Sequence, residues 1–199
     1  METPFEVTWD YLCPFARNAH EHIVEALKAG AGWDVQFRYF SLAQSHLDDG
    51  TTVWEDPAAF PGVLAGLAGI VVREKLPESF LDAHTALFAA RHDQGLDLRS
   101  PDVVVGTLDR IGLDGQAIVE EALSGWPVAQ ARQEHEGAVE QWEVFGVPTF
   151  IAKDRAVFVR LMHRPGGDGE VARATVDKVL DLLDGFPELN EYKFTQIPR

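Results

Sequence analysis

The chain contains a single cysteine, Cys13, which is the first candidate for chemistry. The nucleophile at such a site is the thiolate, yet a free cysteine with a pKa of about 8.5 is mostly protonated at neutral pH. Cys13 directly precedes Pro14, which suits the first position of a helix because its missing N–H would be unpaired there. The sulfur is therefore expected at a helix start, where backbone N–H groups favour negative charge and lower the pKa. The alternative is an inert, buried cysteine acting as a small hydrophobe.

Having only one cysteine limits the available chemistry. It excludes an intramolecular disulfide, a cysteine-rich zinc site and a two-cysteine redox relay. A Cys13 thiolate that attacks a disulfide forms a mixed disulfide, which must wait for a second thiol from outside the chain. The histidines also lack the spacing of a metal site, since His20 and His22 lie two apart on a predicted helix and hence on nearly opposite faces. No metal site is expected.

The elements that must position Cys13 are a strand, a helix and a second strand. Phe5, Val7 and Trp9 alternate with polar residues, a pattern typical of a strand with one buried face. Apolar residues at helical spacing predict a helix over residues 14–27, which Gly30 ends. Alternation over residues 35–39 predicts the second strand, so the chain opens with a βαβ unit.

The remainder divides into a helical block and a second α/β part. Residues 56–125 predict helices and no strand, among them residues 101–111 with Ser100 as cap and residues 114–123. A helix over 128–144, short strands over 147–151 and 156–161 and a helix over 170–183 follow, and the tail from 186 is expected to lie extended on the surface. This order predicts an α/β fold in which a helical insertion domain, 53–125, interrupts one layer formed by 1–52 and 126–199.

This order and two local motifs resemble the DsbA-like branch of the thioredoxin superfamily over essentially the whole chain. Residues 9–16, Trp-Asp-Tyr-Leu-Cys-Pro-Phe-Ala, are similar to the Cys-Pro-x-Cys motif of the family, with Ala16 where the second cysteine would stand. Residues 145–150, Phe-Gly-Val-Pro-Thr-Phe, are similar to the cis-proline loop that faces that motif. The resemblance implies a thioredoxin-like fold with an all-helical insertion between its βαβ and αββα halves.

The resemblance also implies a set of site residues. Cys13 would be the nucleophile, and the backbone around a cis Val147–Pro148 bond would bind a thiol or peptide in extended form. Arg17, one helical turn after the cysteine, is a weaker candidate for electrostatic support, because its side chain can equally point into solvent. The full set of expected catalytic and thiol-binding residues is Cys13, Pro14, Phe15, Val147, Pro148 and Thr149.

Three functions remain open on this basis. The first is a monothiol thiol–disulfide oxidoreductase or thiol transferase, which uses Cys13 with glutathione, mycothiol or another low-molecular-weight thiol and holds no tightly bound cofactor. The second follows the related kappa-class glutathione transferases and 2-hydroxychromene-2-carboxylate isomerases, which carry a serine at this position; Cys13 would then only orient the sulfur of bound glutathione. The third is a binding module without redox chemistry. The alanine at position 16 argues against dithiol oxidase activity.

The composition limits the classes of binding partner that the protein can have. A formal charge of −15 argues against nucleic acid and against anionic membrane surfaces, because both require a surplus of Lys and Arg. No apolar run approaches the roughly 20 residues of a bilayer span, and residues 1–6 lack the features of a secretory signal. We therefore expect a cytoplasmic protein whose partner is a small thiol or disulfide. The residues leave the oligomeric state open, although the resemblance to kappa-class enzymes suggests a homodimer.

Overall fold

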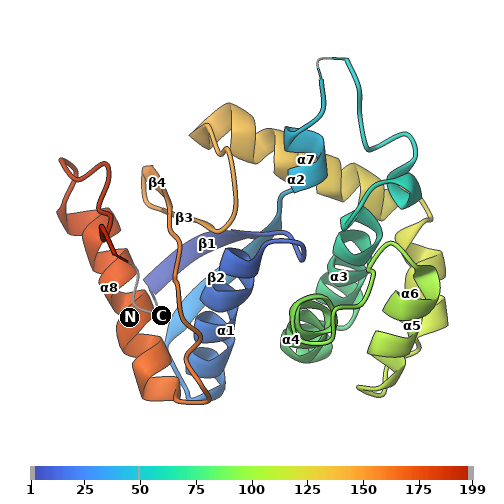
Figure 1. Ribbon diagram of the computed structural model, residues 1–199, viewed down its shortest axis with the longest axis horizontal. Coiled ribbons are helices and arrows are strands. Elements are labelled where there is room, and N and C mark those ends of the chain that lie inside the picture. Colours follow the sequence, from blue (N-terminus) through green and yellow to red (C-terminus); the bar gives the residue numbers. More distant parts are fainter. Residues whose placement is uncertain (1–2, 49, 197–199) are drawn as a thin grey trace.

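The computed structural model describes residues 3–48 and 50–196 and has the expected thioredoxin-like α/β architecture. Figure 1 shows α1 and α8 packed beside the sheet, α3 to α6 gathered on the other side of the molecule, and α7 reaching across both parts. The regular elements are β1 (Thr3–Trp9), α1 (Pro14–Lys28), β2 (Trp33–Tyr39), α2 (Leu42–Ser45), α3 (Val63–Lys75), α4 (Phe80–His92), α5 (Pro101–Asp109), α6 (Gly115–Ala122), α7 (Trp126–Trp142), β3 (Thr149–Ala152), β4 (Arg155–Phe158) and α8 (Gly169–Gly185).

The four strands lie in the order β2-β1-β3-β4. β1 and β2 are parallel, as the intervening helix α1 requires, and β3 is antiparallel to both β1 and β4. β1 was expected to bury one face only, but Thr8 on its other face is also fully buried. The reason is that β1 is a central strand, and the Thr8 hydroxyl accepts a hydrogen bond from the Thr149 N–H.

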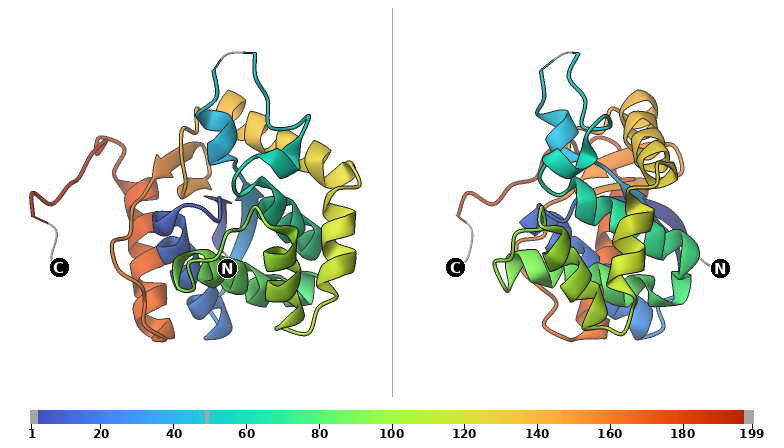
Figure 2. Two further views of the ribbon diagram at one scale, coloured as in Figure 1. Left: turned by 45° about the vertical axis from the view of Figure 1, so that its right-hand side comes forward. Right: turned by 90° about the vertical axis from the view of Figure 1, so that its right-hand side faces the viewer.

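Several predicted boundaries are corrected by the structure. α7 begins at Trp126 and not at residue 128, because Pro127 occupies its first turn, where a missing N–H costs nothing. Ser100 stands at the cap position of α5, but its side chain makes no capping hydrogen bond. The first strand after α7 starts at Thr149, since the two residues before it belong to a loop. The segment after α8 has no helix or strand up to residue 196, and it projects from the body and does not lie over the surface (Figure 2).

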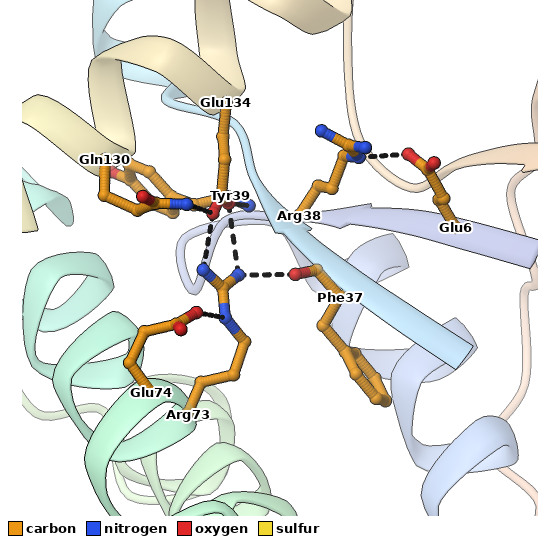
Figure 3. A network of polar contacts seen from close by, with 8 residues as sticks. All are labelled: Glu6, Phe37, Arg38, Tyr39, Arg73, Glu74, Gln130 and Glu134. Atoms are coloured by element: carbon orange, nitrogen blue, oxygen red, sulfur yellow. Dashed lines mark hydrogen bonds and ion pairs between the residues drawn. The ribbon is translucent and has the colours of Figure 1, made fainter. Parts of the chain in front are cut away.

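An ion pair connects the edge of the sheet to the helices (Figure 3). Arg73 of α3 binds Glu134 of α7 through its two terminal guanidinium nitrogens, and the two side chains are only 15% and 6% exposed. Arg73 also donates to the Phe37 carbonyl, and the Glu134 carboxylate accepts from the Tyr39 N–H at 2.6 Å. The two charges thus satisfy outward-facing backbone groups of the edge strand β2. No helix in the described part of the chain has the length and apolar character of a membrane span.

Candidate functional site

Cys13 is the N-cap of α1, as Pro14 at the first helical position predicts. Its backbone is extended, with φ −89° and ψ 118°, and its sulfur accepts a hydrogen bond from the Ala16 N–H at 3.4 Å. The thiol donates to the Val147 carbonyl oxygen, 3.2 Å away and 134 residues along the chain. Only 8% of Cys13 is exposed. The fold therefore brings the cysteine motif and the proline loop into direct contact.

The loop that receives the thiol is held by its own hydrogen bonds. The Val147–Pro148 peptide bond is cis, and both residues are buried. The Thr149 N–H donates to the Thr8 hydroxyl at 2.9 Å, and the Thr149 hydroxyl donates to the Gly146 carbonyl at 2.8 Å. The Val147 N–H makes no hydrogen bond to residues 3–48 or 50–196. Next to Cys13, this loop therefore presents the Val147 N–H as a backbone donor that no other described residue uses.

The environment of Cys13 contradicts the expectation of a lowered pKa. Burial raises the pKa of the thiol most, and the Asp10 carboxylate adds to the increase; the N–H groups of Ala16 and Phe15 at the helix start only partly compensate. The Val147 carbonyl acts in the same direction as burial, because it accepts a hydrogen bond only from the protonated thiol. The resting form of Cys13 at neutral pH is a neutral thiol.

Asp10 is a buried carboxylate three residues before the cysteine. It is fully buried, and its two oxygens accept hydrogen bonds at 2.8 Å from the N–H groups of Leu12 and Leu42. Burial raises its pKa to about 6, against the lowering effect of these two bonds. Asp10 thus ties the loop ahead of Cys13 to the chain that follows β2. In the sequence it was recognised only as part of the motif.

A buried histidine pair supports the same loop, and the sequence analysis missed it. His20 Nε2 lies 3.0 Å from the Thr8 carbonyl, which can only accept, so this nitrogen carries the proton. His20 Nδ1 must then accept from His84 Nε2 at 2.9 Å, and His84 Nδ1 must accept from the Tyr11 hydroxyl at 2.9 Å. Both imidazoles are neutral, because burial lowers the pKa of each. The available signal was the position of His84 among Phe80, Leu87 and Phe88 on an apolar helix face.

Arg17 does not bind the thiol. Its guanidinium pairs with Asp93, at the end of α4, at 2.6 Å, and Asp93 also accepts from Arg164 at 3.2 Å. His92, the neighbouring residue, donates to the Tyr11 carbonyl at 2.9 Å. Arg17 thus helps to join α1 to α4 beside the cysteine loop, and the electrostatic role expected of it is taken by the N–H groups of the helix start.

One cleft of the molecule lies away from Cys13. It has a volume of about 670 Å³ and lies between β2, α3, α4 and α7, beside the ion pair of Arg73 and Glu134. None of the expected site residues lines it. Around the cysteine, Pro14 is exposed and Phe15 half-buried, whereas Val147, Pro148 and Thr149 are buried. Of the expected site residues, Pro14 and Phe15 are therefore the two that a reactant in solution can contact most readily. Within the described residues, no group of three His, Cys, Asp or Glu is placed to hold a metal ion.

Comparison with known proteins agrees with this geometry. A family model described as a DSBA-like thioredoxin domain matches residues 6–163. A solved structure of 2-hydroxychromene-2-carboxylate isomerase is 14% identical with a TM-score of 0.65, covering 90% of this chain and 97% of that one. The cytosolic disulfide reductase DsbM from Pseudomonas aeruginosa with GSH is 17% identical with a TM-score of 0.62 and coverage of 90% and 100%. The oxidoreductase NmDsbA1 from N. meningitidis is 17% identical with a TM-score of 0.59 and coverage of 90% and 82%. No curated protein matches the sequence.

Proposed function

The chain belongs to the DSBA-like thioredoxin domain family, and on this premise we propose that it catalyses thiol–disulfide exchange through Cys13 alone. The observation that carries the proposal is the contact of the Cys13 sulfur with the Val147 carbonyl, immediately before the cis Val147–Pro148 bond. Ala16 occupies the position of a resolving cysteine, and the chain has no other sulfhydryl group. A monothiol reaction with an external thiol fits these residues.

The reaction has two balanced steps. The Cys13 thiolate attacks one sulfur of a disulfide, so that a Cys13–sulfur bond forms while the original S–S bond breaks, and the leaving thiolate takes up a proton. A small external thiol then attacks the mixed disulfide at the substrate's sulfur and is oxidised to a new disulfide with it, while Cys13 leaves as a thiolate and is reprotonated. Glutathione or mycothiol has the required chemistry, and no tightly bound cofactor is needed. We place this reaction in the cytoplasm, supported by the similarity to a cytosolic disulfide reductase.

Substrate docking offers a way to activate the neutral thiol. An extended substrate that donates an N–H to the Val147 carbonyl would replace the thiol as donor, and its own carbonyl would bind the free Val147 N–H. Loss of that contact removes one interaction that favours the protonated form, while the Ala16 N–H remains to stabilise a thiolate. Pro14, Phe15 and Thr149 would border the docked substrate.

The test is turnover of hydroxyethyl disulfide with glutathione as the external thiol. We expect exchange by the wild-type protein and none by Cys13→Ser, because serine cannot form the mixed disulfide. Arg132→Gln, at an exposed position on α7, serves as a control that should retain activity. Exchange by Cys13→Ser at the wild-type rate would contradict the proposal.

One observation favours a second candidate function. A neutral Cys13 thiol that donates a hydrogen bond behaves like the serine of glutathione-dependent isomerases and transferases, and one similar structure is such an isomerase. In that case Cys13 orients the sulfur of bound glutathione and forms no bond to substrate. Two results together would favour this function. A glutathione column would retain Cys13→Ser as well as it retains the wild-type protein, and neither protein would catalyse disulfide exchange. Failure of both assays would leave a binding module.

A further inference from the structure

The segment that connects β4 to α8 runs along the first turns of α1, next to the cysteine. The Asn18 side-chain amide donates to the Leu161 carbonyl at 2.8 Å and so anchors the segment. One residue earlier, the guanidinium of Arg160 lies over the Phe15 ring, 5.4 Å from its centroid. Phe15 is two residues after Cys13, and its N–H acts on the Cys13 sulfur. Arg160 is thus a cation held at the edge of the reactive site.

Arg160 differs from the basic residues around it. Its side chain is exposed, and among the residues that the structure describes no carboxylate lies within ion-pair distance of it. The pKa of Glu191 is lowered mainly by its hydrogen bond from Lys193 and least by Arg160, so that carboxylate already has a partner. The nearby basic side chains are paired. Lys153 of the β3–β4 turn pairs with Asp184, Arg155 of β4 pairs with Asp154, and Arg164 of the connecting segment pairs with Glu21 and Asp93. The aromatic ring, and not an acid, holds the Arg160 guanidinium.

Exposed aromatic surface lies within and beside the loop that carries the Val147 carbonyl. Phe145 is 73% exposed, and its ring contacts Phe158 at a centroid distance of 5.1 Å. A Cβ on Gly146, between Phe145 and Val147, would lie 3.4 Å from the Phe158 ring. The two rings therefore flank the loop that binds the Cys13 thiol. Large exposed aromatic side chains beside a reactive group are typical of a binding surface.

We propose that the disulfide substrate of Cys13 carries a carboxylate that binds Arg160, next to an apolar part that contacts Phe145 and Phe158. This inference rests on the proposed exchange function and names its substrate class. With a net charge of −15, the protein as a whole repels anions, so a local cation is needed to admit such a substrate. A guanidinium already oriented by the Phe15 ring provides two parallel donors to a carboxylate.

The experiment compares two aromatic disulfides that react with Cys13. The probe 5,5′-dithiobis(2-nitrobenzoate) carries a carboxylate on each ring, and 4,4′-dithiodipyridine is uncharged at pH 8. The second-order rate constant of each probe is measured for wild type, Arg160→Gln, Arg160→Lys and Arg132→Gln. Arg132 is an exposed residue of α7, and its substitution changes the net charge equally at a distant place.

We expect Arg160→Gln to slow the carboxylated probe about fivefold and to leave the rate of the uncharged probe unchanged. Arg160→Lys keeps part of the wild-type rate with the carboxylated probe, and Arg132→Gln keeps all of it. Added NaCl reduces the effect of Arg160→Gln on the carboxylated probe. Equal slowing of both probes, or no change with either, overturns the inference while the exchange function stands. If wild-type Cys13 forms a mixed disulfide with neither probe, the exchange function fails and this inference fails with it.

Discussion

Mild acid should destabilise the protein through its buried histidines. Burial lowers the pKa of His20 to about 4 and that of His84 well below its ordinary value of about 6.5. Both rings are neutral in the folded chain, whereas in the unfolded chain they take up protons near pH 6.5. Between pH 6.5 and pH 4 the unfolded state therefore binds more protons than the folded state. The stability that the neutral histidines contribute is present above about pH 6.5 and is lost as the pH falls towards 4.

The magnitude follows from the number of protons. Each such histidine costs about 1.4 kcal/mol of unfolding free energy per pH unit. His135, whose pKa burial lowers to about 4, makes a third. Asp10 acts in the opposite direction, because its folded pKa of about 6 lies above its ordinary value, and it restores stability as the pH falls through 6. Near pH 5 these four groups give a net difference of about two protons, or about 2.7 kcal/mol per pH unit, and His92, whose pKa burial also lowers, adds to it.

Urea unfolding at pH 7, 6 and 5 and constant ionic strength, followed by tryptophan fluorescence, measures this slope. His20→Gln should be less stable at pH 7, because the donor to the Thr8 carbonyl is disturbed, but its slope should be smaller by about 1.4 kcal/mol per pH unit. His163→Gln, at an exposed position, should keep the wild-type slope. A slope in His20→Gln equal to that of wild type would refute the assignment of a neutral buried imidazole.

Two further predictions concern packing between the sheet and the helices. Glu134→Gln leaves the Arg73 guanidinium without its buried counter-charge and should lower the free energy of unfolding in urea by about 3 kcal/mol. A decrease no larger than that for breaking an ordinary exposed ion pair would contradict the role shown in Figure 3. Gly66→Ala should lower the unfolding free energy by about 2 kcal/mol, because its Cβ would lie 2.2 Å from a ring carbon of Tyr39. Gly137→Ala, with open space around it, should raise the unfolding free energy by about 1 kcal/mol. Equal effects of the two substitutions on the unfolding midpoint would show that the contact at Tyr39 is unimportant.

The local sequence determined the elements and the place of the cysteine in them. Apolar spacing predicted α1, and Pro14 placed Cys13 at its cap, because both signals depend only on residues close along the chain. Gly30, with φ +89°, ended that helix as expected. The contact between Cys13 and the proline loop came from resemblance to a family, since nothing in either segment alone encodes a partner 134 residues away.

The tertiary structure decided the electrostatics of the site. The sequence indicates the N–H groups of a helix start, which lower the pKa of Cys13, but the burial and the Val147 carbonyl that raise it depend on packing by distant segments. The same reason explains why Arg17 binds Asp93 and why His84 supports Tyr11: each partner lies more than 70 residues away. Hydrophobic periodicity reports which face of an element is buried, whereas a pKa depends on every charge, dipole and apolar group that the fold places around one atom.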